Sequence, residues 1–293
     1  MRFSYAICSM MMAFGVGAFA QCPADPTTIL AGRWTFQGGP NSMTGQLIFR
    51  PGTFGISVIT TTVQAGSLIT DDNATGSYFL NADCASGGIF INNIYSPAQW
   101  NFTIATSATF GRTLALTSLT INAPTPTNPG VSVPTSAGTA WPAPAGCPAN
   151  LASPVNLLSG TYNTVSLSNV TVTGGAGSSL RGSIEILPPG NLFGTPMGNL
   201  IARLTPVYPA TPPVPTSNPP TQLLPAVSIS GDEGSYSVQS DCQRVSFAIN
   251  YDWPRPVCYA GYPRIRTNGV TEFVVVGANL IGDPLVSTGS IAR

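Results

Sequence analysis

The side chains that usually perform catalysis are scarce in this chain of 293 residues. It contains no histidine, and all 11 of its basic residues are arginines. Without histidine, the Ser-His-Asp and Cys-His arrangements of nucleophilic catalysis are excluded, and so are zinc sites built on imidazole. Without lysine there is no Schiff-base chemistry. No glycine-rich phosphate-binding motif occurs either. We therefore expect a protein without enzymatic activity that uses neither a metal nor an organic cofactor.

Paired carboxylates are the remaining source of catalytic chemistry. Asp71-Asp72 and Asp232-Glu233 each stand just before a Gly-Ser-Tyr sequence. Two carboxylates across one cleft would suit a glycoside hydrolase, and clustered carboxylates would suit calcium. Calcium needs about 6–8 oxygen ligands, more than these short acidic pairs supply, and Asp also favours plain solvated turns. A carboxylate-dependent glycosidase is therefore kept only as an alternative.

One segment combines aromatic and cationic side chains in a way that suggests binding. It runs over residues 252–266 and is also rich in proline. Tryptophan, tyrosine and arginine are enriched at binding hot spots, where rings stack on sugars or cations and arginine pairs with carboxylates. The predicted ligand-binding residues are Trp253, Arg255, Tyr259, Tyr262, Arg264 and Arg266. The alternative is a long loop folded over one end of a barrel and held there by Cys258.

A sequence pattern that occurs twice indicates two related domains in tandem. Gly76-Ser77-Tyr78, followed by Asp83-Cys84, returns as Gly234-Ser235-Tyr236, followed by Asp241-Cys242. Each copy also has a matching upstream element, Cys22-Pro23-Ala24 or Cys147-Pro148-Ala149. The simplest explanation is an internal duplication in which each domain carries one early and one late cysteine.

The first 20 residues have the form of a secretory signal peptide. Arg2 supplies a positive start, and residues 7–19 form an apolar stretch too short to span a bilayer. Ala18-Phe19-Ala20 is a small-x-small cleavage site. A lipoprotein signal with Cys22 acylated fits less well, because Gln21 stands where a small residue is expected. No later segment is apolar enough for a membrane span, so we expect a secreted, surface-associated or periplasmic protein.

The cysteines of the mature chain are expected to form disulfides, the default in an exported protein. The duplication favours the equivalent pairs Cys22–Cys84 and Cys147–Cys242. In the chain-entropy account, each bridge would stabilise its domain by about 4 kcal/mol. Cys258 is then left over. The main rival pairing, Cys242 with Cys258, would leave Cys147 alone, and spacing does not decide between the two.

Short apolar–polar alternation predicts β-strands over most of the chain. Clear examples lie over residues 46–49, 100–104 and 271–276, and no segment shows a helical stripe with caps. Turn signals such as Pro51-Gly52 and Gly87-Gly88 separate the strands at short intervals. We therefore predict an all-β fold of two tandem antiparallel β-barrels or sandwiches joined by a proline-rich linker.

Composition sets the expected domain boundaries. They are a signal peptide over 1–20, domain one over 21–122, a proline-rich linker over 123–145, and domain two over 146–293 with a proline-studded insertion over 206–225. Prolines would hold the linker extended and fairly stiff. Trp141 within it is a candidate for docking on a neighbouring domain.

The duplicated core resembles exported bacterial proteins built from small lipocalin-like or avidin-like β-barrels. The Gly-x-Tyr strand opener and the Asn81-Ala82-Asp83-Cys84 turn of the first copy carry this resemblance, whereas the second copy has Gln239 at the Asn position. The resemblance implies a fold and brings no catalytic residues with it.

Charge is sparse. Charged residues make up 8% of the chain and cancel to a net charge of zero, against about 25% charged residues in a typical soluble domain. Nucleic acid is not an expected partner, because phosphate binding needs a basic patch. We expect an exported, non-enzymatic protein that binds a glycan, a small ligand or a cell-surface partner through domain two. The alternative is an extracellular structural component that self-associates. N-glycosylation sequons begin at Asn73, Asn101 and Asn169.

Overall fold

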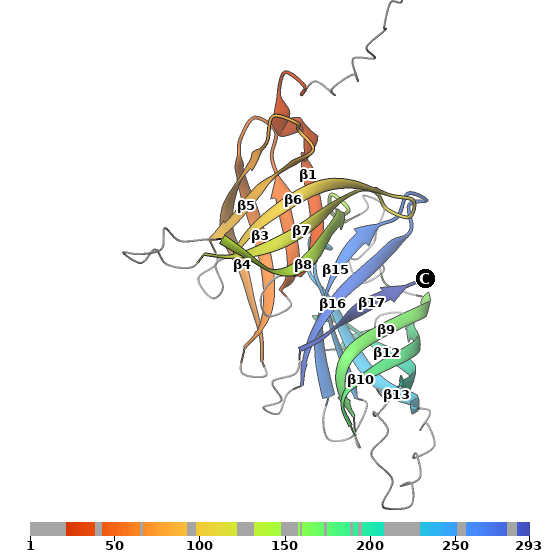
Figure 1. Cartoon of the computed structure of the whole chain (residues 1–293). Helices are drawn as coiled ribbons and strands as arrows, with labels where there is room; N and C mark the ends of the chain where they lie inside the picture. Colours follow the sequence, from red (N-terminus) through yellow and green to blue (C-terminus); the bar gives the residue numbers. More distant parts are fainter. Residues whose placement is uncertain are drawn as a thin grey trace, which may run out of the picture.

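Two antiparallel eight-stranded β-barrels, one in each half of the chain, make up the fold (Figure 1). The computed structural model describes residues 22–38, 43–64, 67–92, 98–121, 132–147, 158, 160–172, 175–187, 190–192, 195–207, 229–250, 256–279 and 286–293. The expected signal peptide and most of the expected insertion over 206–225 lie outside these residues. The prediction of an all-β fold with two barrels is confirmed.

Barrel one is a meander in which each strand pairs with the next and the eighth returns to the first. Its strands are β1 Gly32–Gly38, β2 Thr44–Phe49, β3 Gly55–Gln64, β4 Ser67–Leu80, β5 Ser86–Asn92, β6 Ala98–Ser107, β7 Gly111–Ile121 and β8 Ser132–Pro142. Large apolar side chains such as Trp34, Phe36 and Trp100 fill its interior, as expected for a barrel of this strand number.

Strand β8 corrects the expected linker over 123–145. It pairs with both β7 and β1 and so closes barrel one, which therefore extends past residue 122. Proline is tolerated in a sheet at strand ends and at bulges. Pro142 is the last residue of β8, and Pro134 lies at a register shift opposite Leu119. The prolines thus mark the irregular points of a barrel strand.

Barrel two repeats the meander with one addition. Its strands are β9 Gly160–Val172, β10 Gly175–Ile186, β11 Gly190–Leu192, β12 Thr195–Val207, β13 Ile229–Val238, β14 Val245–Asn250, β15 Pro256–Ile265, β16 Thr271–Asn279 and β17 Val286–Ala292. The short β11 pairs only with β12, while β10 pairs with β12 directly and closes the barrel. A second apolar cluster, which includes Tyr162, Phe247 and Phe273, fills this interior.

The repeated Gly-Ser-Tyr motif has the same structural role in both barrels. A Cβ at Gly76 would lie 2.2 Å from the carbonyl oxygen of Phe90, and one at Gly234 would lie 2.4 Å from that of Ala248. Only glycine lets the neighbouring strand approach so closely. The tyrosines two residues later, Tyr78 and Tyr236, point into the barrels and are buried.

The disulfides also lie at equivalent positions in the two barrels. Cys22–Cys84 and Cys147–Cys242 are bonded, with Cα–Cα distances of 5.6 and 5.0 Å, and Cys258 is free, so the expected pairing is confirmed. Among the described residues, Cys84 and Cys242 are the non-glycine positions with positive φ, at 51° and 59°. Each ends a turn stabilised by the preceding aspartate, which accepts backbone hydrogen bonds two residues on. In the described part of the chain, no helix is long and apolar enough to cross a membrane.

Candidate functional site

The structure describes four of the predicted ligand-binding residues, namely Tyr259, Tyr262, Arg264 and Arg266. Trp253 and Arg255 lie outside the described residues. Tyr259, on β15, is 1% exposed and belongs to the core of barrel two, with its hydroxyl 3.3 Å from that of Ser287. Successive strand residues point to opposite faces, so Tyr262 and Arg264 point out of barrel two.

Barrel one covers that outward face. Strands β15 and β16 contact β1–β4 and β8 (Figure 1). An apolar cluster fills the contact, with members Ile59, Val63 and Leu68 from barrel one and Ala260, Tyr262, Val276 and Ala278 from barrel two. Since β15 and β16 are buried on both faces, the predicted segment joins the two barrels to each other.

Tyr262 is the polar centre of this contact. It is fully buried, and its hydroxyl lies 2.6 Å from the hydroxyl of Thr61, which in turn lies 2.9 Å from that of Thr70. Burial raises the pKa of Tyr262 to about 12, and the hydrogen bond to Thr61 and the charge of Arg244 offset this rise only in part. The phenol is therefore held in its neutral form.

Arg264 inserts between two aromatic rings of barrel one. Its guanidinium carbon lies 4.5 Å from the ring centroid of Phe110 and 4.6 Å from that of Trp141. Its Nε and Nη2 donate to Oε2 of Glu272 at 3.1 and 2.9 Å. Glu272 is 1% exposed and also forms an ion pair with Arg266. Burial lowers the pKa of Arg264, and the Glu272 carboxylate opposes that effect.

Hydrogen bonds between the barrels surround these two residues. The Thr35 hydroxyl donates to the carbonyl oxygen of Pro263, and Gln37 Nε2 donates to that of Val275 at 3.2 Å. Arg244 and Asp72 form an ion pair of 2.6 Å across the boundary. The backbone amide of Thr267 in barrel two also donates to the carbonyl oxygen of Thr109 in barrel one at 2.9 Å. The contact thus combines an apolar cluster with buried hydroxyl groups, hydrogen bonds and ion pairs between the barrels.

Only barrel two has an apolar outer face on the strands that form this contact, β15 and β16. β6 and β7 take the place in barrel one that β15 and β16 take in barrel two, because the row Tyr78–Ile89–Trp100 matches the row Tyr236–Phe247–Tyr259. The buried pair Ala260–Val276 then corresponds to Asn101–Thr117, which is exposed. Polar side chains therefore occupy this face of barrel one.

The paired carboxylates do not form a described acidic cleft. Asp71 accepts a hydrogen bond from the backbone of Asn73, and Asp72 pairs with Arg244. The side chains of Asp232 and Glu233 lie outside the described residues. Among the residues that the structure describes, no group of three or more carboxylate, cysteine or histidine side chains could hold a metal ion.

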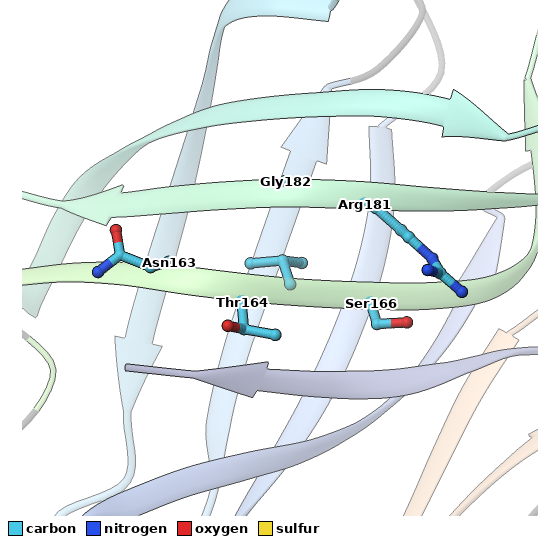
Figure 2. Close-up of a pocket in the computed structure, with 6 residues that line it drawn as sticks. Asn163, Thr164, Ser166, Arg181 and Gly182 are labelled. Atoms are coloured by element: carbon cyan, nitrogen blue, oxygen red, sulfur yellow. The ribbon is translucent and has the colours of Figure 1, made fainter.

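A shallow hollow of about 390 Å³ lies on the outer wall of barrel two. Its lining consists of Asn163, Thr164, Val165, Ser166, Arg181 and Gly182. In Figure 2, the polar residues of β9 follow one another along the strand, and Arg181 reaches over from the neighbouring β10. The sequence prediction did not include these residues, because serine, threonine and asparagine on alternating strand positions look like any solvated sheet face.

A pair of exposed phenylalanines lies on the outer wall of barrel one. Phe79 on β4 is 43% exposed and Phe90 on β5 is 36% exposed, with ring centroids 6.2 Å apart and planes inclined by 35°. We call this pair, together with Gly88 and Asn101 beside it, the aromatic platform. The run Ile89-Phe90-Ile91 is the sequence signal for it, because the middle residue of three apolar strand residues must face outward.

Comparison of the chain with protein-family models and with curated proteins finds no match.

Replacing Arg264 with alanine is expected to weaken the contact between the barrels. The change removes both ring contacts and leaves Glu272 buried with Arg266 as its remaining partner, which should cost about 3 kcal/mol of unfolding free energy. Urea unfolding followed by tryptophan fluorescence measures the loss. The matched control is Arg203→Ala, which breaks the exposed pair with Glu185 and should cost at most about 1 kcal/mol. Equal losses in the two variants would contradict the assignment.

Tyr262 should make stability fall at high pH. Its pKa is about 12 in the folded protein against an ordinary value of 10.0. A raised pKa means that the stabilisation is complete below pH 10 and is lost as pH rises toward about 12. The unfolding free energy should therefore drop between these values by roughly 2–3 kcal/mol more in the wild type than in Tyr262→Phe. Parallel stability curves for the two proteins would show that this phenol is not buried at the contact.

Proposed function

We propose that this chain is an exported, non-enzymatic protein that binds an uncharged polysaccharide on the aromatic platform of barrel one. The exposed pair Phe79 and Phe90 on a charge-free sheet face is the observation that supports this most directly. The form of the N-terminus and the disulfides in both barrels are compatible with export. The equivalent strand positions of the repeated motifs suit an origin by internal duplication.

The ring of Phe79 lies flat on the sheet. A Cβ built on Gly88 would meet Cε1, Cζ and Cδ1 of Phe79 at 2.4, 2.8 and 3.3 Å. The ring therefore rests on the glycine backbone with one face and presents the other to solvent. Aromatic rings are large apolar surfaces with little conformational freedom to lose. An outward ring face is the geometry that stacking on the apolar face of a sugar ring requires.

Uncharged hydrogen-bonding groups surround the rings. Register places Asn101 next to Gly88, Gln99 next to Phe90, and Ser77 on the other side of Phe90. Asn101 and Ser77 are exposed. Residues 75–80, 86–92 and 98–107 contain no aspartate, glutamate or arginine. Amides and hydroxyls can donate to and accept from sugar hydroxyls, whereas a charged partner would find no counter-charge on these strands.

This proposal moves binding from domain two to barrel one. Apolar side chains fill the described interiors of both barrels. Of the predicted residues in the 252–266 segment, Tyr259 lies inside barrel two, and Tyr262 and Arg264 lie against barrel one. Outer walls remain for a partner. A flat, open wall suits an extended polymer better than a small ligand, which pockets usually enclose.

Removing the two rings should weaken binding to insoluble neutral polysaccharide. The intact protein is mixed with cellulose and with chitin, and the bound fraction is measured over a concentration series. Phe79→Ala/Phe90→Ala should weaken binding roughly tenfold or more, since loss of large aromatic anchors typically costs about 2 kcal/mol or more.

Phe54→Ala is the matched control. Phe54 is 45% exposed on the same barrel, but its ring packs on Tyr78 at 5.2 Å, away from the pair. This variant should bind like the wild type. Wild-type binding by the double variant, or no binding to either polymer, would refute the proposal. Conversion of a dimer into a monomer by the double substitution would refute it too, because the rings would then serve self-association.

A further inference from the structure

The hollow of barrel two lies on a wall that corresponds to the wall of barrel one contacted by β15 and β16. β9 and β10 take the places in barrel two that β1 and β2 take in barrel one, and the pair Tyr162–Ile184 corresponds to Trp34–Leu47. Gly182 and Gly45, two residues before Ile184 and Leu47, therefore correspond to each other. A Cβ at either glycine would lie 1.9 Å from a carbonyl oxygen of the next strand, Arg203 or Ile59. The two walls therefore take the same place in the barrel topology, and in both the next strand passes close to this glycine.

In barrel one, side chains of this wall donate hydrogen bonds to backbone carbonyl oxygens of barrel two. Thr35 donates to the carbonyl oxygen of Pro263, and Gln37 donates to that of Val275. Thr35, Thr44 and Gln46 on the same wall are fully buried. At Thr35 and Gln37 the wall thus donates hydrogen bonds to acceptors on β15 and β16.

In barrel two the donors are kept, but the wall is open and carries a cation. Asn163 follows Tyr162 as Thr35 follows Trp34, and Ser166 lies one residue beyond the buried Val165. Arg181 stands where barrel one has Thr44. Asn163, Thr164 and Arg181 are exposed, and within the described residues Arg181 has no ion-pair or hydrogen-bond partner. The neutral Thr44 of barrel one is thus replaced in barrel two by a free guanidinium.

Irregular pairing makes the hollow. The register between β9 and β10 shifts between Gly175 and Ser178, between Ser178 and Leu180, and again between Gly182 and Ile184. Gly182 has a φ of 156°, so the strand takes a conformation that other residues rarely adopt. Bulges of this kind re-aim side chains and occur next to binding sites. Here they set Asn163 and Thr164 side by side on the exposed wall.

We propose that this hollow binds the carboxylate group of an acidic saccharide, such as a uronic acid residue. Arg181 pairs with the carboxylate through its planar fork of donors. The Thr164 and Ser166 hydroxyls and the Asn163 amide meet the sugar hydroxyls around it. The hollow is shallow, and its one apolar lining residue, Val165, is buried. This site is separate from the aromatic platform and does not depend on it.

A second copy of the chain is a poorer occupant. The strands that would dock by analogy are β6 and β7 of another barrel one. Their outward residues include Asn101, Thr103 and Thr117, and neither strand contains an aspartate or glutamate. They would bury Arg181 without a counter-charge, which is costly.

Calorimetry of the intact protein tests the proposal with three probes of similar length: tetragalacturonate, neutral cellotetraose and a tetraglutamate peptide. Tetragalacturonate should bind, and the other two should bind at least roughly tenfold more weakly. Arg181→Gln should weaken tetragalacturonate binding roughly tenfold or more, because it removes a charge-assisted pair. Asn163→Ala should weaken it severalfold. Both positions are exposed, and circular dichroism verifies the fold of each variant.

Arg203→Gln is the matched control, because Arg203 lies on the next strand, pairs with Glu185 at 3.3 Å and does not line the hollow. It should change tetragalacturonate binding less than about twofold. Equal loss in Arg203→Gln and Arg181→Gln, equal binding of any two probes, or no binding at all would overturn the proposal. Phe79→Ala/Phe90→Ala should leave this binding unchanged, so failure of either site can be told from failure of the other.

Discussion

The insertion of Arg264 between Phe110 and Trp141 is the interaction on which the arrangement of the molecule depends. A guanidinium that leaves water needs a counter-charge and complete hydrogen bonding. Glu272 supplies the charge from the neighbouring strand, and the two rings supply faces to which a flat cation is attracted. With Tyr262 and its apolar neighbours beside it, this contact gives the two barrels a defined relative position.

Docking also explains why the two barrels are unequal. They share a meander, a disulfide-bonded turn and a Gly-Ser-Tyr motif within a strand. Yet the Ala260–Val276 pair of one is the Asn101–Thr117 pair of the other. One barrel carries an apolar outer face and the other receives it. Two surfaces lie outside this contact, the aromatic platform on barrel one and the hollow on barrel two. Their side chains can differ without disturbing the contact. Their chemistry is different, since one is neutral and aromatic and the other polar and cationic.

The sequence was sufficient for much of the fold. Alternation predicts strands because half-buried strands alternate, and the duplicated cysteines predict both bridges. Proline obscured β8, since a strand with Pro134 at a bulge resembles a linker. Trp141 does contact the other barrel, as expected.

The segment over 252–266 has hot-spot composition, but such composition is the same for contacts within a chain and between chains, so the partner could not be inferred. The unbroken apolar run Phe273–Val276 was the usable signal, because a strand buried on both faces loses its alternation. The platform and the hollow depend on register, which places Gly88 under Phe79 and Arg181 beside Ser166, and register was not visible in the sequence.

The central claim is that the two barrels form one body held by β15 and β16 rather than two domains on a tether. The direct measurement is to place a protease site within residues 144–146, between the last strand of barrel one and Cys147, which is bonded to Cys242 of barrel two. The folded protein is then cleaved, and its mass in solution is determined under native conditions. The account predicts one particle of the full mass, which separates into two only when Arg264 is also replaced or the protein is unfolded. Two separate halves directly after cleavage of the otherwise unaltered protein would contradict it.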